Sequence, residues 1–204
     1  MTTLFWAIWL AISVFIIGIF VWTTKALFEQ KAAWRTFAER RKLKYLPTRF
    51  LSSPVIKGLI DGNDFYLASE LRDSGDLRGR RFKTVMQFGL PMRMPAGAVV
   101  GSGDFVGFVR ALDARDDLRL SFEGIPEGSV IGRSDNAEKI ADYFTPERVK
   151  VLETLVKQKG VSVLFLFDDK YAYLRLETVD PMINATNLDK LVDRLLPMMK
   201  TMWA

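Results

Sequence analysis

Residues 4–23 read LFWAIWLAISVFIIGIFVWT, a stretch of about 20 residues without a charged side chain. At the helical rise of about 1.5 Å per residue, this stretch covers the ~30 Å hydrocarbon layer of a bilayer. Trp6 and Trp9 lie near one end and Trp22 lies at the other, where the membrane–water interface favours aromatic rings. We therefore predict a transmembrane anchor over residues 1–23.

The predicted span contains no ionisable side chain that would mark an ion or proton path. Gly18 is a small residue of the kind that lets neighbouring helices approach closely. A cleaved signal peptide is the alternative, but Met1, Thr2 and Thr3 lack the basic side chain with which such peptides begin. The span is expected to stay attached, as an anchor or as a packing partner for other membrane helices.

The formal net charge of +5 is concentrated directly after the predicted span. Residues 25–49 carry +6, with only Glu29 and Glu39 opposing the basic side chains, which leaves −1 for residues 50–204. Near an anionic membrane surface, each such cation contributes about 1 kcal/mol of attraction. We predict headgroup contact for Lys25, Lys31, Arg35, Arg40, Arg41, Lys42 and Lys44, and no nucleic-acid partner.

Every Lys and Arg near the predicted span lies on its C-terminal side. Loops rich in these residues remain in the cytoplasm. The expected topology is a single pass through a bacterial inner membrane, with the N-terminus outside and the C-terminal domain in the cytoplasm.

Histidine and cysteine are both absent from the sequence. Mechanisms of the Ser-His-Asp, Cys-His and zinc-hydrolase types therefore cannot be built from this chain alone. The glycines of residues 101–107 (GSGDFVG) have the wrong spacing for a dinucleotide-binding loop and predict a flexible loop instead. The acidic residues 113–117 and 168–169 are interpreted as turns rather than metal ligands. We predict no catalytic, cofactor or metal site, and a protein that is not an enzyme.

The helical pattern continues past the span, in a basic juxtamembrane helix over residues 24–46. Leu27, Trp34 and Phe37 form an apolar stripe beside a charged face. Two interpretations remain open: the stripe packs on the domain as core, or it lies on lipid.

Residues 47–204 are predicted to form one α+β domain, with a mainly antiparallel sheet packed against C-terminal helices. Asp61-Gly62 favours a tight turn, because these residues tolerate the positive φ that such a turn requires. Residues 91–107 are rich in Gly and Pro and predict an irregular segment around a short strand. The strands expected in the first part of the domain are residues 55–60, 65–71, 81–90 and 118–122.

The C-terminal third begins with helix signals. Asp135 followed by Glu138 resembles a capping box, and Thr145-Pro146 combines a cap with Pro at the first helical position. Gly160 is expected to end this second helix. A hairpin of residues 161–167 and 171–177 follows, and its apolar first strand predicts a central place in the sheet.

Thr186 is expected to cap the last helix, which Pro197 interrupts. Met199, Met202 and Trp203 give this helix an adaptable apolar end, either core or a docking surface for another protein.

Residues 121–177 resemble the pattern of a family of uncharacterised bacterial membrane proteins. In that pattern a strand leads to an Asp (here Asp135), a short helix, a Thr-Pro helix start, a Leu-rich helix and a hairpin. GLIDGNDFYL (58–67) and RFKTVMQF (81–88) are similar to the family's opening strands. The resemblance implies an N-terminal hydrophobic segment followed by an α+β domain, and it carries no catalytic motif.

These observations favour a membrane-anchored accessory, scaffold or interaction protein, whose partners are membrane lipid and other membrane proteins. The alternative is a membrane-proximal sensor, or a module that binds anionic lipid through its basic residues.

Overall fold

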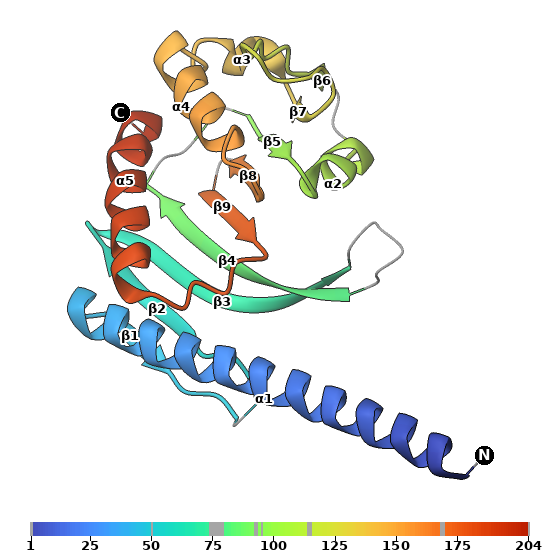
Figure 1. The fold of residues 1–204 in the computed structure, drawn as a ribbon. Helices are drawn as coiled ribbons and strands as arrows, with labels where there is room; N and C mark the ends of the chain where they lie inside the picture. Colours follow the sequence, from blue (N-terminus) through green and yellow to red (C-terminus); the bar gives the residue numbers. More distant parts are fainter. Residues whose placement is uncertain are drawn as a thin grey trace.

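The computed structural model describes residues 2–49, 51–73, 80–91, 94, 96–113, 116–167 and 170–203. One long helix, α1 (Thr2–Arg41), leads into an antiparallel sheet covered by further helices (Figure 1). This arrangement confirms the predicted α+β class.

The sheet has nine strands in the order β1-β2-β3-β4-β9-β8-β5-β7-β6, with antiparallel neighbours throughout. β8 pairs with β9 on one side and β5 on the other, which confirms its predicted central place. The strands are β1 (Lys44–Leu46), β2 (Val55–Ile60), β3 (Asn63–Asp73), β4 (Arg80–Leu90), β5 (Ala98–Ser102), β6 (Asp116–Asp117), β7 (Val130–Ser134), β8 (Val161–Phe167) and β9 (Ala172–Thr178). The shorter helices are α2 (Phe105–Ala111), α3 (Ala137–Ala141), α4 (Pro146–Val156) and α5 (Ala185–Trp203).

The β2–β3 hairpin forms as the turn chemistry predicts. Asp61 and Gly62 have φ values of 50° and 82°, and Ile60 pairs with Asn63 across this two-residue turn. The β8–β9 hairpin also forms, although its turn residues 168–169 lie outside the described residues.

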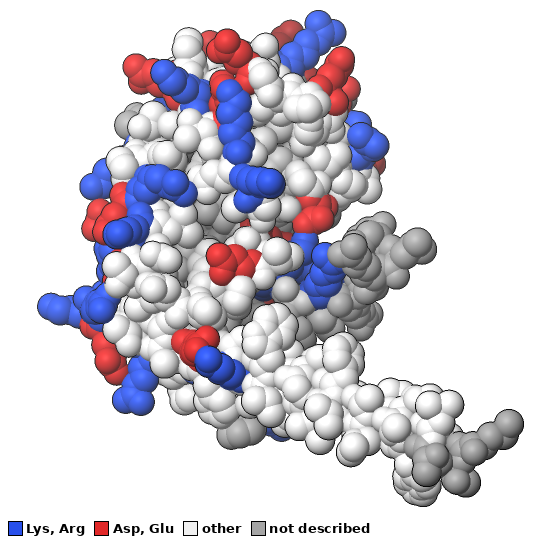
Figure 2. Space-filling view, viewed as in Figure 1, with Lys and Arg blue, Asp and Glu red and all other residues white. Residues whose placement is uncertain are grey.

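The first half of α1 projects away from the domain (Figure 1). It is the helix, within the described part of the chain, that is long and apolar enough to cross a membrane, with a mean hydropathy of 2.6 over its most apolar window and no residue of that window buried. Figure 2 shows no charged side chain on the visible face of this projection, whereas charges are scattered over the domain. The chain thus has the form of a single-pass membrane protein.

The second half of α1 is part of the domain core. Trp34 and Phe37 are fully buried, and the Phe37 ring lies 5.9 Å from that of Phe65, which lies 5.0 Å from Phe88. Of the two interpretations of the apolar stripe, the structure supports core packing. β1 also pairs with β2, so the later part of residues 24–46 packs with the sheet and its core.

Residues 118–122 were expected to form a strand and do not. Leu118 N donates a hydrogen bond to Gly132 O and Leu120 N to Leu118 O, so the ladder with β7 ends here. Leu118, Leu120 and Phe122 still pack against the core. Their alternation therefore reflects side-chain packing without strand pairing.

Two predicted helix caps are wrong by one or two residues. Asn136, not Asp135, accepts the capping hydrogen bond of α3 from Lys139 N, at 3.0 Å. Asn184, not Thr186, accepts that of α5 from Asn187 N, at 3.1 Å. In each case neighbouring residues could both cap, and the chain path selects between them.

Two further features of the helices in the C-terminal third differ from the prediction. Thr145 caps α4 as predicted, but α4 ends at Val156, before Gly160. Pro197 lies inside α5, which continues through it to Trp203.

Candidate functional site: the open face of the sheet

The two faces of the sheet have different surroundings. The inner face packs against α1, α4 and α5 in the main core. On the outer face, α2 contacts β5, β7 and β8, where Val109 packs with Val99 and Leu164. Next to this cluster, β2, β3, β4 and β9 line an open hollow on the same face, and Tyr173 lies between the cluster and the hollow.

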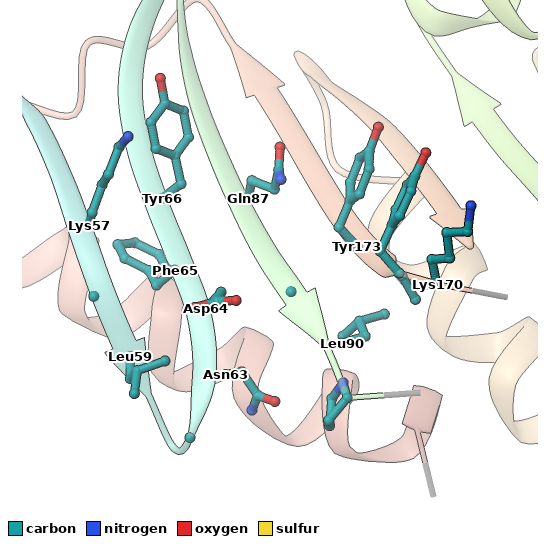
Figure 3. Close-up of a pocket in the computed structure, with 16 residues that line it drawn as sticks. Lys57, Leu59, Asn63, Asp64, Phe65, Tyr66, Gln87, Leu90, Lys170 and Tyr173 are labelled. Atoms are coloured by element: carbon teal, nitrogen blue, oxygen red, sulfur yellow. The ribbon is translucent and has the colours of Figure 1, made fainter. Parts of the chain in front are cut away.

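This open face, defined as the outer surface of β2, β3, β4 and β9, holds a hollow of about 1150 Å³. Figure 3 shows Tyr66 and Tyr173 on either side of Gln87, with helices behind the sheet. The rings of Tyr171 and Tyr173 are stacked at 10°, with centroids 6.3 Å apart. On the other side, the Lys57 ammonium lies 5.4 Å from the centre of the Tyr66 ring. Aromatic rings therefore form both walls.

Gly89 lies at the bottom of the hollow, where it has no side chain to fill the space. It pairs with Tyr173 across β4 and β9, and a Cβ at this position would lie 3.1 Å from Asp64 Cβ. The space between Asp64 and Tyr173 is consequently open.

Four charged side chains from β3 and β9 form an ionic network at the edge of the open face. Arg175 Nη2 lies 2.6 Å from Glu70 Oε2, and Arg175 Nε donates to Glu177 Oε1 at 2.8 Å. Arg72 Nη2 lies 2.9 Å from Glu70 and 3.2 Å from Glu177. Because Glu177 is only 2% exposed, this pairing is what makes its burial tolerable.

Burial and neighbouring charges shift the pKa values of side chains on and beside the open face. Burial, followed by the charge and hydrogen bond of Glu70, raises the pKa of Tyr66, and burial raises that of Tyr173. Burial acts to lower the pKa of Arg175, but the hydrogen bond to Glu70 and the charges of Glu177 and Glu70 outweigh it, so that pKa is raised. The hydroxyls therefore stay protonated at neutral pH, with Tyr66 Oη donating to Glu70 Oε1 at 3.4 Å.

A second polar cluster fixes α2 to the sheet. Lys83 of β4, 5% exposed, forms an ion pair with Asp104, directly before α2. Ser162 Oγ donates to Asp104 Oδ2 at 2.9 Å and accepts from Asp104 N at 3.1 Å. The hydrogen bond from Lys83 holds the pKa of Asp104 below its ordinary value. This corrects the prediction of a flexible loop over residues 101–107, since the segment is strand, turn and helix.

Among the described residues, no group of three or more acidic side chains is placed to hold a metal ion. Asp116 accepts from Ala137 N at 2.9 Å, and Asp117 lies 3.1 Å from Arg133 Nε. These acidic residues have structural partners, whereas the cluster at 168–169 lies outside the described residues.

The predicted headgroup contacts divide along α1. At about 1.5 Å per residue, Lys25 lies within about 5 Å of Trp22 along the helix axis, whereas Arg41 lies about 28 Å away. The screening length is about 8 Å at physiological salt, so a cation at that distance gains little from an anionic surface. Contact of Lys25 and Lys31 with headgroups stays a prediction. Lys42 and Lys44 follow Arg41 in the chain and so lie still farther from Trp22 than Lys25 and Lys31 do.

Arg40 and Arg41 have protein partners. Arg40 Nη1 lies 3.0 Å from Asp189 Oδ2, and Arg41 contacts Asp189 at 2.9 Å and Asp193 at 2.7 Å. Arg35 pairs with Glu39 at 2.9 Å. Arg40 and Arg41 thus have carboxylate partners on α5, and their contact with headgroups stays a prediction.

The C-terminal methionines are core residues. Met199 and Met202 are buried, and Trp203 packs, partly buried, against the same cluster. Of the two interpretations left open for Met199, Met202 and Trp203, the structure supports core packing, because α5 turns its apolar stripe toward the sheet.

Sequence reasoning missed the open face and both polar clusters. In β3, β4 and β9, polar and apolar residues alternate along the strand. The polar positions include Tyr66, Glu70, Arg72, Lys83, Arg175 and Glu177. The alternation shows that these side chains share the outer face, but only the pairing of β4 with both β3 and β9 brings them together.

The fold resembles that of a mycobacterial transport factor. The crystal structure of the mycobacterial trehalose monomycolate transport factor A, TtfA, superimposes with a TM-score of 0.50 at 10% identity, over 84% of this chain and 91% of that one. At this identity the likeness shows the fold alone. No family model and no curated protein matches the sequence, so the resemblance to a family of uncharacterised membrane proteins has no further support.

Proposed function

We propose that this chain is a non-enzymatic, membrane-anchored accessory protein that presents the open face of its sheet to a partner membrane protein. The observation that carries the proposal is the open face itself, a hollow of about 1150 Å³ walled by tyrosines on a surface that the helices leave uncovered.

The chemistry of the open face suits a protein partner. Tyr and Arg are enriched at interfaces, because a large side chain with few rotatable bonds buries apolar area while its polar end forms hydrogen bonds. Tyr66, Tyr171 and Tyr173 supply the aromatic area, and the exposed Leu59 extends it at the edge of β2. The paired charges of Glu70 and Arg175 supply polar groups beside it.

The continuous helix favours a partner in the same membrane. α1 runs without interruption from Thr2 to Arg41, and its second half is locked into the domain core. The domain is thereby held at a fixed distance from the predicted span. A partner that is itself membrane-bound meets the open face without a search through bulk solution.

The non-enzymatic part of the proposal rests on chemistry. The sequence has no His or Cys, and Glu70, Glu177 and Asp104 are each engaged in ion pairs. These ion pairs join β3 to β9 and the start of α2 to β4. The name of the structural neighbour, a transport factor, agrees with an accessory role.

We further propose that the membrane is a bacterial inner membrane, with the N-terminus outside and the domain in the cytoplasm. Lys25 and Lys31, which follow the span, support this orientation. A C-terminal reporter that fluoresces only in the cytoplasm tests it, and a reporter that is dark there but accessible to external protease would contradict it.

Photo-crosslinking from the open face tests the interaction. A photoreactive phenylalanine analogue replaces Leu59 or Tyr171 in the full-length protein, and the same analogue at the exposed Lys190 of α5 is the control. We expect one reproducible membrane-protein adduct from the open face and none from Lys190. The double variant Leu59→Arg/Tyr171→Ala should weaken co-purification of that partner at least about tenfold, which corresponds to 1.4 kcal/mol. Identical adducts from both faces, or none, would contradict the proposal.

A further inference from the structure

A separate hollow lies where α1 meets the domain. It has a volume of about 680 Å³ and lies between the end of the predicted span and the sheet. The helix contributes Phe20, Trp22 and Leu27, and the domain contributes Leu51, Phe82 and Val179. We call this the junction groove.

The domain side of the junction groove exposes large apolar side chains. Leu51, Phe82 and Val179 are 60%, 69% and 59% exposed, and they come from the β1–β2 connection, β4 and the segment after β9. An exposed apolar surface formed by three separate segments is unusual on a domain that is surrounded by water. Such a surface marks a contact with a partner or a membrane.

Three of the polar side chains that line the junction groove hold its walls together. Gln30 Nε2 donates to Pro181 O at 2.8 Å, Ser53 Oγ donates to Gln30 Oε1 at 2.8 Å, and Thr84 Oγ1 donates to Asp180 O at 2.7 Å. The first two bonds join α1 to the segments that carry Leu51 and Val179, and the third joins β4 to the segment that carries Val179. Because these three side chains are engaged and large apolar side chains line both walls, the groove favours an alkyl chain over a polar solute.

The position of the groove along α1 identifies the source of such a chain. Residues 4–23 fill about 30 Å of helix, so Phe20 and Trp22 lie at the boundary between acyl chains and headgroups. Phe20 and Trp22 are exposed on the surface of the span, and the same two side chains line the groove. A lipid that covers the helix therefore reaches the groove without leaving the bilayer.

We propose that the junction groove holds an acyl chain of a bilayer lipid from the leaflet next to the domain, so that Leu51, Phe82 and Val179 rest in the membrane interface. This inference goes beyond the interaction at the open face and shares with it only the premise that α1 spans the bilayer. Burial of these exposed apolar side chains in lipid removes them from water and so provides the stabilising free energy.

The test uses the full-length protein in lipid nanodiscs of phosphatidylcholine and phosphatidylglycerol that contain a lipid with a photoactivatable diazirine on its acyl chain. Mass spectrometry then maps the adducts after irradiation. We expect adducts on residues 4–23 and also on Phe82 and Val179. Leu59, which is 62% exposed on the open face, is the matched control and should remain unlabelled.

Two variants test whether the labelling depends on the apolar side chains of the groove. Phe82→Arg and Val179→Arg change exposed side chains, and each should lower labelling of the groove at least about fivefold while labelling of residues 4–23 and the Tm stay unchanged. Leu59→Arg should alter neither.

Labelling of residues 4–23 with none on Phe82 and Val179 overturns the proposal, points to a protein occupant, and leaves the open-face interaction intact. Equal labelling of Leu59 also overturns it, because contact is then nonspecific. Absence of labelling on residues 4–23 refutes the span itself and, with it, both proposals.

Discussion

Arg41 Nε lies 2.9 Å from Asp189 Oδ1, which joins the end of the anchor helix to the first turns of α5 across 148 residues of sequence. The Arg41 side chain also reaches Asp193 Oδ1 at 2.7 Å. Burial acts to lower the pKa of Arg41, but these two carboxylates outweigh it, and the pKa is raised. The contact fastens the helix that enters the membrane to the helix that covers the sheet.

Asp189→Asn should therefore destabilise the full-length protein in detergent. Hydrogen bonds to charged groups contribute about 1.5–3 kcal/mol, which corresponds to a Tm lower by roughly 3–12 °C for a chain of this size. Circular dichroism during heating measures the change. Glu39→Gln is the control, because its pair with Arg35 is exposed and contributes less than about 1 kcal/mol. Equal Tm values for the two variants would contradict the fastening role.

Truncation should distinguish the span from the core part of α1. The side chains of residues 4–23 are all exposed, so removal of residues 1–23 should leave a cooperatively folding domain. Removal of residues 1–46 also deletes Trp34, Phe37 and β1, and should abolish cooperative unfolding.

Trp34→Ala provides the same test at one position, with an expected loss of about 3–5 kcal/mol. Trp22→Ala, at an exposed ring of the same helix, should leave the Tm in detergent nearly unchanged. A stable fragment beginning at residue 47 would show that α1 is dispensable to the core.

The Lys83–Asp104 pair should respond unequally to loss of its two members. Asp104→Ala leaves the Lys83 ammonium, 5% exposed, without its carboxylate, and should cost roughly 1–3 kcal/mol. Lys83→Met leaves Asp104, with 53% of its side chain exposed, to be solvated, and should cost less than about 1 kcal/mol. Denaturant unfolding of the full-length protein measures both, and a larger cost for Lys83→Met would contradict this account.

The same pair predicts a pH dependence. Because the folded-state pKa of Asp104 lies below the unfolded value of 3.8, the ionised form stabilises the fold above that value, and the contribution is lost as pH falls through the folded-state pKa. The difference in stability between the natural protein and Asp104→Asn should stay constant from about pH 5 to pH 8 and shrink below about pH 4. A difference that instead grows in acid would show the opposite sign of linkage.

The features that the sequence predicted correctly depend on residues that are adjacent in the chain. The Asp61-Gly62 turn forms because its positive φ values are properties of two adjacent residues, and Thr145-Pro146 starts α4 for a similar reason. Leu118, Leu120 and Phe122 misled the prediction because their alternation serves core packing. The ionic network depends on Glu70 and Arg175, 105 residues apart, which meet only through the pairing of β4 with both β3 and β9. No short-range pattern encodes that pairing.

Two glycines near α2 should respond to substitution in opposite directions. Gly101 lies under the helix, and a Cβ there would meet Val109 Cγ2 at 2.6 Å and Phe105 Cβ at 3.1 Å. Gly101→Ala therefore pushes α2 away from β5 and should cost about 1–3 kcal/mol. Gly107 lies within α2, where a Cβ would meet nothing within 4 Å. Gly107→Ala should stabilise the protein by about 0.5–1 kcal/mol, since alanine favours the helix. Thermal unfolding of both variants in detergent measures the difference, and a shift in the same direction would mean that α2 does not pack on Gly101.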